Sequence, residues 1–582
     1  MGAVPMHLSY FEGSIFEMVR AQAKARPKGI AFDFMGSSTS YAALLGQIEA
    51  CARAFLALGL VPGDRITIAM PNCPQAIAAF YAVNRIGALA NMIHPLSAEK
   101  EIEFYLNESE SKAILTLDQF YPKIQAIRAA TGVRHVILCS IADALSLPMK
   151  LGYGLTQGRK IPKVPKNAPV ILWRDFLKAG EAHPLDVALP DSEDPCAILY
   201  SGGTTGTTKG ILLTNRNFNA LARQIVATNP MFRPGDKMLA VMPMFHGFGL
   251  GVTIHSMLAS GGCCILVPRF TPASYAKMMV KYRCNLIAGV PTLYEALLRL
   301  PKMENADLSC LKGVYSGGDS LSIELKKRFD QFLFDHHASI QVREGYGLTE
   351  CVTASCLTPY HQSREGSIGI PFPDTYYKIV KPGTQEEVPY GEEGEICLAG
   401  PTVMKGYLDR PEETADTLQK HADGLTWVHT GDLGVMDKDG FVYFRQRIKR
   451  MIITSGYNVY PGQLENIFDA HELVQMSCVI GVPDPLKMQK VKAFVMLKPG
   501  VPATQETKDT LMAYARKNIA RYAMPYDIEF REELPKTLVG KVAYRLLEEE
   551  ELAKLAKDAP AEEEAAPEAI ENPESSEGTE QA

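Results

Sequence analysis

The segment Tyr200–Gly210 combines residue types that can surround a phosphate group. It reads Tyr-Ser-Gly-Gly-Thr-Thr-Gly-Thr-Thr-Lys-Gly and follows the apolar run Cys196–Leu199. Its glycines allow backbone N–H groups to face an anion, its hydroxyls can donate hydrogen bonds, and Lys209 adds positive charge. It differs from a Walker-type loop because a strand-like run, rather than Ser or Thr and a helix, follows Lys209. We therefore predict a phosphate-binding loop; the alternative on these residues alone is a flexible linker.

A second segment, Glu344–Glu350, places a tyrosine between two glycines. Tyr346 can present its ring face to a flat base because its neighbours have no side chains. Thr349 offers a hydroxyl, and Glu350 offers a hard oxygen of the kind that Mg²⁺ prefers. These residues predict part of a nucleotide site, and the alternative is an ordinary glycine-rich turn.

A third segment, Thr430-Gly431-Asp432, is followed along the chain by Arg447. An acidic side chain can accept hydrogen bonds from both hydroxyls of a ribose. The Arg447 guanidinium can donate to the same sugar. The segment therefore predicts a ribose contact; taken in isolation it is equally consistent with a simple turn.

The fourth segment, Leu534–Lys541, ends in Gly540-Lys541. The glycine allows a sharp turn that leaves Lys541 at the tip of a loop. One mobile cation there can neutralise charge that develops between an attacking carboxylate and an α-phosphate. The alternative for a lysine after a glycine is a plain surface residue.

In this order, the four segments closely resemble the adenylate-forming superfamily of acyl- and aryl-CoA synthetases, luciferases and peptide-synthetase adenylation domains. The resemblance extends over about residues 10 to 546, and bacterial long-chain fatty-acid–CoA ligases are the most similar group. It implies ATP, Mg²⁺ and CoA as cofactors and a carboxylic acid, first of all a long-chain fatty acid, as substrate. Further matching elements are Gly202-Gly203, Thr208, Met242–His246, Gly289–Tyr294, Ser316–Asp319, Ile453–Pro461 and Glu465.

The resemblance also implies a role for each matching residue. Lys541, Thr349, Glu350 and His246 are expected at the reacting groups, although His246 is alternatively a packed core histidine. Thr204 and Glu350 are expected to hold Mg²⁺, and Lys449 is expected at a hinge. The residues expected to bind the nucleotide or CoA are Ser201, Gly202, Gly203, Thr204, Thr205, Gly206, Lys209, Gly318, Tyr346, Asp432, Arg447, Lys449, Ser455, Gly456 and Tyr457.

Several substrates remain compatible with these motifs, because the lining of an acid pocket cannot be read from them. Medium-chain, aryl or steroid acids could replace the long-chain acid, and an acyl carrier protein could replace CoA as acceptor. A non-catalytic scaffold protein is a further alternative, but it predicts damaged motifs, whereas Glu350, Asp432, Arg447 and Lys541 are all present.

The elements that must position these residues follow an α/β pattern. Strand-like runs such as Asp64–Met70 and Leu311–Tyr315 alternate with helical patterns such as Tyr41–Leu60 and Gln75–Ile86, which is typical of parallel sheets. We predict an α/β fold with a large N-terminal domain, made of two α/β subdomains and a small β subdomain, and a mobile, small α+β C-terminal domain. The predicted ranges are 1–447, 448–547 and an acidic, disordered tail over 548–582.

Composition sets outer limits on function. The chain has 582 residues and a formal net charge of -6, and the tail from Ala559 holds eight Glu and no Lys or Arg. The remaining body is near neutral, which gives no argument for nucleic-acid binding. The twelve cysteines form no Cys-x-x-Cys pair, so we expect buried, reduced thiols. The sequence contains no feature that indicates an oligomeric state.

The chain shows no signal for membrane insertion. Met1–Gly13 lacks the basic and apolar regions of a signal peptide, and the most apolar run, Gly251–Val267, is interrupted by His255 and by Gly261-Gly262. We therefore expect a cytoplasmic protein. Residues 149–167 carry five basic side chains without periodicity, which predicts an irregular surface loop. It could contact anionic lipid at the inner face of the membrane, or be merely solvated.

Overall fold

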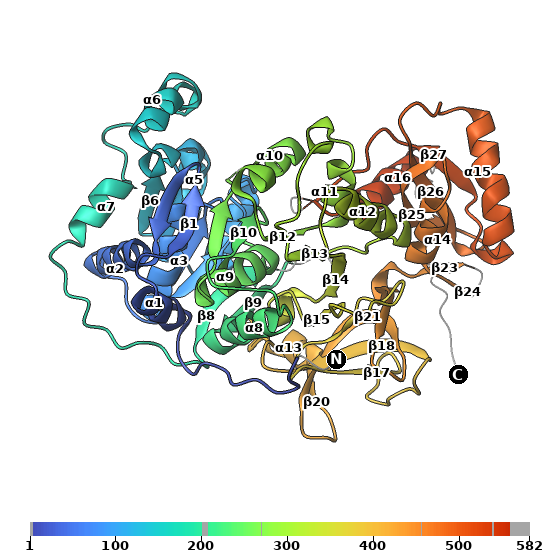
Figure 1. Ribbon diagram of the computed structural model, residues 1–582, viewed down its shortest axis with the longest axis horizontal. Helices are drawn as coiled ribbons and strands as arrows, with labels where there is room; N and C mark the ends of the chain where they lie inside the picture. The colour runs from blue at the N-terminus through green and yellow to red at the C-terminus, as the bar shows by residue number, and fades with distance from the viewer. Residues whose placement is uncertain (1–3, 201–207, 269, 455–456, 538–539, 559–582) are drawn as a thin grey trace, which may run out of the picture.

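The computed structural model describes residues 4–200, 208–268, 270–454, 457–537 and 540–558. They form two large sheets, a smaller β-rich unit and a C-terminal α+β unit (Figure 1). The predicted fold class is confirmed. Both large sheets contribute to one continuous buried core, whereas the C-terminal strands and helices bury a separate set of apolar residues.

The first large sheet has nine strands, and its central strands are parallel. Parallel neighbours need crossover connections, and helices supply most of them. In spatial order the strands are β16 (Ile370–Pro371), β15 (Cys356–Leu357), β14 (Val342–Tyr346), β13 (Gly313–Ser316), β12 (Leu286–Gly289), β10 (Lys237–Ala240), β11 (Cys263–Leu266), β1 (Ile30–Phe34) and β2 (Ser37–Ser40).

The second large sheet has eight strands, and the β8–β9 hairpin lies near one edge of it. That hairpin frames the predicted phosphate loop. In spatial order the strands are β19 (Gly406–Tyr407), β9 (Gly210–Thr214), β8 (Pro195–Tyr200), β4 (Leu89–Met92), β3 (Arg65–Ala69), β5 (Ala113–Leu117), β6 (His135–Cys139) and β7 (Ile171–Leu172).

Helix α3 (Pro74–Arg85) shows how the sequence specifies this core. Every residue from Gln75 to Asn84 is buried, as expected for a helix that is apolar on all sides. Its Phe80 ring packs on Phe218 of α8 (Asn215–Ala227). The remaining helices of the N-terminal part are α1 (Ile15–Ala25), α2 (Tyr41–Ala57), α4 (Glu99–Glu108), α5 (Tyr121–Ile127), α6 (Leu147–Leu155), α7 (Trp173–Ala179), α9 (Ser256–Ala259), α10 (Pro272–Tyr282), α11 (Pro291–Leu297), α12 (Ile323–Asp335) and α13 (Pro411–Thr417).

The two smaller sheets follow in the chain. The first contains β17 (Tyr376–Val380), β18 (Glu393–Ala399), β21 (Thr426–Met436), β20 (Leu418–Lys420) and β22 (Val442–Arg447). The C-terminal unit contains β24 (Tyr457–Val459), β23 (Ile452–Thr454), β26 (Met488–Leu497), β25 (Val474–Asp484) and β27 (Asp527–Phe530), with α14 (Pro461–Asp469), α15 (Gln505–Asn518) and α16 (Tyr544–Asp558).

The predicted irregular loop over 149–167 is wrong in its first part. Leu147–Leu155 forms α6, followed by a single 3₁₀ turn, Gln157–Lys160. Leucines at 147, 151 and 155 recur at helical spacing, but two glycines and a proline among them obscure the pattern. All three leucines are exposed, so the helix has no buried apolar face that its sequence could have indicated. In Figure 1, α6 stands apart from the sheets.

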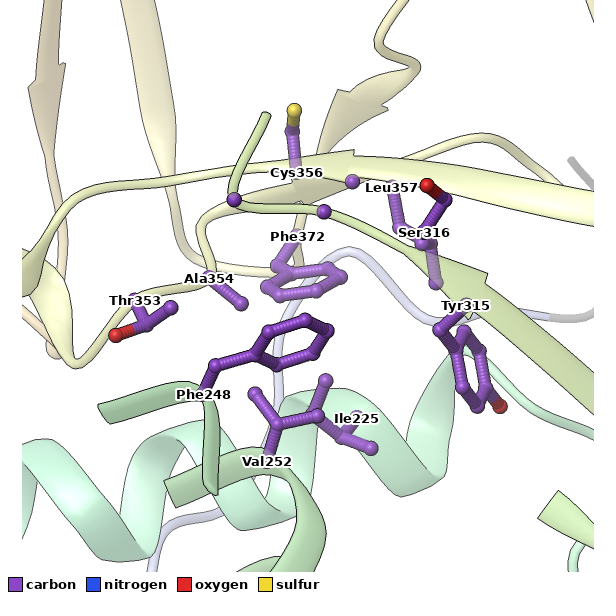
Figure 2. Close-up of a pocket in the computed structure, with 13 residues that line it drawn as sticks. Ile225, Phe248, Val252, Tyr315, Ser316, Thr353, Ala354, Cys356, Leu357 and Phe372 are labelled. Atoms are coloured by element: carbon purple, nitrogen blue, oxygen red, sulfur yellow. The ribbon is translucent and has the colours of Figure 1, made fainter. Parts of the chain in front are cut away.

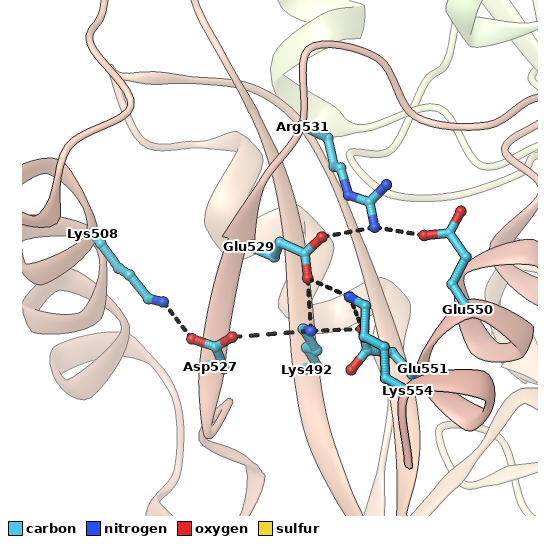
Figure 3. A network of polar contacts seen from close by, with 8 residues as sticks. All are labelled: Lys492, Lys508, Asp527, Glu529, Arg531, Glu550, Glu551 and Lys554. Atoms are coloured by element: carbon cyan, nitrogen blue, oxygen red, sulfur yellow. Dashed lines mark hydrogen bonds and ion pairs between the residues drawn. The ribbon is translucent and has the colours of Figure 1, made fainter. Parts of the chain in front are cut away.

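The predicted tail from residue 548 begins inside a helix, because α16 continues to Asp558. Ion pairs hold α16 against β26 and β27 (Figure 3). Lys492 Nζ lies 2.7 Å from a Glu551 oxygen and 2.8 Å from a Glu529 oxygen, and Lys492 and Glu551 are buried. Acidic side chains within 548–558 therefore form ion pairs with basic residues of the sheet. The rest of the predicted tail, 559–582, lies outside the described residues.

All twelve cysteines carry free thiols and all but Cys310 are buried. Within the described ranges, no helix has both the length and the apolar character that a bilayer crossing requires.

We predict that Lys492→Met loosens α16, because it leaves the buried Glu551 carboxylate without its buried cation. Removing one partner of a buried ion pair costs about 3 kcal/mol, so amide hydrogen exchange in α16 should become much faster. Lys554→Met is the matched control: Lys554 contacts the same two glutamates but its side chain is half exposed, so we expect about 0–1 kcal/mol. Equal exchange in both variants would contradict the central role of Lys492.

Candidate active site

The β8–β9 hairpin brings both ends of the predicted phosphate loop together. Tyr200 and Gly210 are paired across the hairpin, so the two ends of the predicted loop lie side by side. Ser201, Gly202, Gly203, Thr204, Thr205 and Gly206 lie outside the described residues. Lys209 is described: its Nζ lies 4.8 Å from the centroid of the Tyr407 ring.

Tyr407 connects this hairpin to the predicted Mg²⁺ residue. It belongs to β19, which pairs with β9, and its hydroxyl donates to Glu350 Oε1 at 2.8 Å. Lys209, Tyr407 and Glu350 therefore form one group. Sequence reasoning missed Tyr407, because the Gly-Tyr pair that carries it has no chemical pattern of its own.

The loop after β14 is held in a constrained conformation. Val352 and Thr353 have φ values of 54° and 82°, which non-glycine residues rarely adopt. A Cβ on Gly347 would collide with the Thr353 carbonyl oxygen, so glycine is required there. The Met404 N–H also donates to the Glu350 carbonyl at 2.8 Å. Thr349 and Glu350, in the 3₁₀ turn Thr349–Cys351, thus have a fixed backbone, and strain of this kind is frequent at functional sites.

Asp432 is the centre of a second group. The β21–β22 register places it opposite Arg447, whose Nε lies 3.7 Å from Asp432 Oδ1. The Tyr346 hydroxyl donates to Asp432 Oδ2 at 2.6 Å. Burial raises the pKa of Asp432 to about 6, against the opposing effects of Arg447 and the Tyr346 hydrogen bond.

Lys541 approaches this group from the C-terminal unit. Gly540 has φ +85°, and its carbonyl accepts a hydrogen bond from the Thr292 hydroxyl at 2.8 Å. The Lys541 Cε is 3.3 Å from where a Cβ on Gly318 would stand, so a side chain there would obstruct it. Burial and then Arg447 lower the pKa of Lys541, while Asp319 and Asp432 act in the opposite direction.

Two residues in this contact were missed or given no role. Thr292 lies in the Gly289–Tyr294 run, which matches the family pattern but had no predicted role. Asp319 follows Gly318, and its Oδ2 accepts a hydrogen bond from the Val542 N–H at 3.4 Å. The structure therefore brings Gly318, Tyr346, Asp432, Arg447 and Lys541 together from separate segments.

An apolar pocket lies beside Gly318. Figure 2 shows the Phe248 and Phe372 rings facing one another across it, with Val252 and Ile225 below. Phe248–His255 forms a π-helix, a conformation often found at functional sites. The remaining lining residues are Tyr315, Ser316, Gly317, Gly318, Gly345, Thr353, Ala354, Cys356 and Leu357.

His246 lies just before this π-helix and is half-buried. Its Nδ1 accepts a hydrogen bond from the Phe248 N–H at 3.1 Å. Burial, and then the Lys541 charge, lower the His246 pKa to about 3. The imidazole is therefore neutral and electrostatically coupled to Lys541.

Of the predicted hinge and CoA residues, Lys449 and Tyr457 are among the described residues. Lys449 is in the 3₁₀ turn Ile448–Arg450 between β22 and β23. Tyr457, on the edge strand β24, is 55% exposed, and its ring stacks on Tyr522 with centroids 4.6 Å apart. Ser455 and Gly456 lie outside the described residues.

Known protein families match nearly all of this architecture. A model described as AMP-binding enzyme matches residues 19–408, and one described as AMP-binding enzyme C-terminal domain matches residues 463–541. The chain belongs to the AMP-binding enzyme family. The predicted resemblance is confirmed, and the second match coincides with the unit that carries Lys541.

Relatives within the family include a long-chain-fatty-acid--CoA ligase of Bacillus subtilis (strain 168). It is 36% identical over 555 residues, which are 94% of this chain and 96% of the relative. A long-chain-fatty-acid--CoA ligase of Salmonella typhimurium is 35% identical over 88% of this chain and 90% of its own. A feruloyl-CoA synthase of Amycolatopsis is 30% identical over 90% of this chain and 96% of its own.

Solved structures share the fold. ATP-bound MatB from Rhodopseudomonas palustris has a TM-score of 0.80 at 26% identity, covering 93% of this chain and 99% of its own. The anthranilate CoA ligase AuaEII in complex with anthranoyl-AMP has a TM-score of 0.81 at 24% identity, covering 95% and 100% of the two chains.

We predict that Tyr346→Phe shifts the pH dependence of AMP binding. The Tyr346 hydrogen bond lowers the Asp432 pKa, so its loss should raise that pKa above about 6. An ionised carboxylate is the stronger hydrogen-bond acceptor. Affinity should therefore fall as the pH falls through the Asp432 pKa, and the midpoint should lie at higher pH in the variant.

Isothermal titration calorimetry with AMP at a series of pH values measures this shift. Titration of the AMP phosphate is common to both proteins, so only the difference between their midpoints is interpreted. Tyr282→Phe removes a hydroxyl that donates to Asp33, outside this group, and should leave the midpoint unchanged. Identical midpoints for Tyr346→Phe and the wild type would contradict the prediction.

Proposed function

We propose that this chain is an AMP-forming long-chain fatty-acid–CoA ligase. One observation carries the proposal: Lys541 lies beside Gly318, at the edge of an apolar pocket, where the charges of Asp432 and Arg447 act on it. A nucleotide group, a mobile cation and an apolar cavity are the parts needed to join an acid to AMP. The long-chain ligases among the relatives support the fatty acid as substrate.

In the proposed first step, the carboxylate attacks the α-phosphorus of ATP. A carboxylate oxygen–phosphorus bond forms, the bond to the bridging oxygen breaks, and pyrophosphate leaves. Positioning and electrostatic stabilisation dominate such transfers. Asp432 and Arg447 would hold the ribose, Gly318 and Tyr346 would line the adenine site, and Lys541 would neutralise charge between carboxylate and phosphate.

The phosphates would be bound by residues 201–206, Lys209 and Thr349. Glu350 fits a Mg²⁺ ligand, because its carboxylate is half-buried and Tyr407 donates to only one of its oxygens. With Thr204 it would hold Mg²⁺, which neutralises phosphate charge when bound. Because Tyr407 orients Glu350 and faces Lys209, phosphate and metal contacts would be aligned together.

In the proposed second step, the CoA thiolate attacks the acyl carbonyl and AMP leaves. Lys541 would withdraw first, because the C-terminal unit that carries it would turn a different face to the site. A rotation about the turn that contains Lys449 would remove it. The same rotation would turn Ser455, Gly456 and the exposed Tyr457 toward the site, which is a common use of a hinge.

The pocket favours an apolar substrate tail. Phe248, Val252, Leu357 and Phe372 supply apolar surface, and His246, two residues before Phe248, is neutral and adds no charge nearby. Each buried methylene of a tail contributes about 0.8 kcal/mol, so a longer acid gains affinity as far as the cavity can open.

The test is AMP release with acids from acetate to oleate, plus coumarate and cholate, with and without CoA. We expect long-chain acids to be the best substrates, with CoA required for turnover. Lys541→Ala should form AMP about 10²–10³-fold more slowly with an unchanged circular dichroism spectrum. Lys536→Ala, an exposed lysine on the same loop, should retain activity.

Three outcomes of this assay would each contradict a different part of the proposed function. A higher rate with an aromatic or steroid acid would overturn the substrate class but not the chemistry. Acyl-AMP formation without thioester formation would overturn CoA as acceptor, and a full rate in Lys541→Ala would remove that residue from the first step.

We also propose that α6 contacts an anionic membrane surface from the cytoplasmic side. Leu147, Leu151 and Leu155 recur every four residues and so lie on one face, and they are 78%, 71% and 64% exposed. Basic side chains accompany this apolar stripe at Lys150, Arg159, Lys160, Lys163 and Lys166. Apolar insertion together with basic attraction is the pattern of interfacial helices.

Co-sedimentation with phosphatidylglycerol vesicles tests this contact. We expect binding that weakens as salt increases and is lower on phosphatidylcholine vesicles. Changing all three leucines to Ser should lower partitioning at least about tenfold, because each buried leucine contributes about 1.5–3 kcal/mol. Leu486→Ser, at a 94% exposed position elsewhere, is the control. Equal binding by both variants would exclude α6 as the contact.

A further inference from the structure

Three side chains that can ligate a metal ion meet on one face of the small β sheet. Glu395 and Cys397 are two residues apart in β18, and Cys397 is paired with His429 of β21. The Cys397 Sγ lies 3.6 Å from His429 Nδ1, and Glu395 Oε2 lies 3.0 Å from the same nitrogen. One ligand atom of each residue lies within 4.8 Å of the others, and within the described ranges no second trio of such groups does so.

These separations suit tetrahedral zinc. With Zn–S near 2.3 Å and Zn–N near 2.0–2.1 Å, two ligands at a tetrahedral angle stand about 3.5 Å apart. The Cys397–His429 separation already has this value, and the Glu395–His429 separation needs only a small widening. Thiolate, imidazole and carboxylate are all ligands that zinc accepts, and three protein ligands leave a fourth position open.

A fourth residue orients the histidine. His421 Nε2 lies 3.0 Å from His429 Nε2, so one proton between the two rings fixes both tautomers. Without metal, the His429 Nδ1–H donates to Glu395. A bound ion would take the place of that proton, and the His429 Nε2–H would donate to His421, as metal-bound histidines usually donate their second N–H. The other ring nitrogen of His421 is buried and has no hydrogen-bond partner among the described residues.

The nearest cation is directed elsewhere. Lys378 is paired with Cys397 from the other side, on β17. Its Nζ lies 3.2 Å from an Asp423 oxygen and 4.1 Å from the centroid of the Trp427 ring. The Glu395 carboxylate is buried, with the His429 ring and a backbone N–H as its hydrogen-bond partners, and it could offer its charge to a metal ion.

The trio of Glu395, Cys397 and His429 lies next to the segment that carries Asp432, the proposed ribose contact. The second oxygen of Glu395 accepts a hydrogen bond from the Gly431 N–H at 2.9 Å. Glu395 is paired with Leu433 and Cys397 with His429, so Thr430, Gly431 and Asp432 form an irregularity of β21 between these partners, and such bulges often re-aim side chains beside active sites. The trio and Asp432 therefore share one piece of backbone.

We propose that Glu395, Cys397 and His429 form a binding site for a borderline-soft divalent cation, Zn²⁺ first of all. His421 orients His429 within it. This site is distinct from the Mg²⁺ position at Glu350 and does not depend on the identity of the acid substrate. Because Glu395 contacts both the site and Gly431, the bound ion also fixes the bulge that carries Asp432.

The test uses the full chain stripped of metal with a chelator and titrated with Zn²⁺ alone against a chromophoric competitor. We expect one tight equivalent in the wild type and loss of that equivalent in Cys397→Ser and in His429→Gln. His421→Phe should weaken binding about 10- to 100-fold. Cys310→Ser, which removes the one partly exposed thiol outside the trio, is the matched control and should bind as the wild type does.

Cobalt supplies a readout that needs no variant. Co²⁺ in the wild type should give a thiolate-to-metal charge-transfer band together with the intense visible bands of four-coordinate geometry, and Zn²⁺ should displace both. Wild-type affinity in Cys397→Ser and His429→Gln, or a cobalt complex without the charge-transfer band, would overturn the proposal. Neither readout involves catalysis, so the result is separate from the fate of the proposed ligase activity.

Discussion

The contact between the Gly540–Lys541 loop and the end of β13 is the constraint on which the rest of this site depends. Lys541 lies beside Gly318 near the Asp432–Arg447 pair, and a Cβ on Gly318 would stand 3.3 Å from the Lys541 Cε and crowd it. Hydrogen bonds from Thr292 to Gly540 and from Val542 to Asp319 fix the loop on either side. A cation brought in by a separate unit can be removed again, which a residue built into the large sheets could not be.

The surrounding N-terminal framework is rigid by comparison. The strained turn at Val352-Thr353, the required Gly347 and the Tyr407–Glu350 hydrogen bond leave little freedom to the residues that would meet the phosphates. Such preorganisation stabilises developing charge without reorganisation during the reaction. The site thus combines a fixed half, made by the two large sheets and the small β sheet, with one charge that the C-terminal unit supplies.

Sequence alone predicted the fold class and the residues that meet around Lys541, because segments such as Thr430–Asp432 rarely occur by chance in this order along one chain. It did not identify Tyr407, whose importance comes from its position across β9 and β19. It also missed α6, whose leucines are exposed. It started the tail too early, because Lys492, the buried partner of Glu551, lies in a strand more than fifty residues earlier in the sequence. A single sequence shows local periodicity and chemical motifs, but it does not show which distant residues come into contact in the folded protein.

The separate core of the C-terminal unit has a consequence for its motion. Since its apolar residues are buried among themselves, rotation of the whole unit exposes none of that core. The hydrogen bonds that must break include those of Thr292 with Gly540, Val542 with Asp319 and Tyr460 with Glu393, each with a net value of about 0.5–1.5 kcal/mol. If the unit rotates as proposed, these hydrogen bonds are a small cost, and a bound ligand needs only a modest preference to favour one orientation.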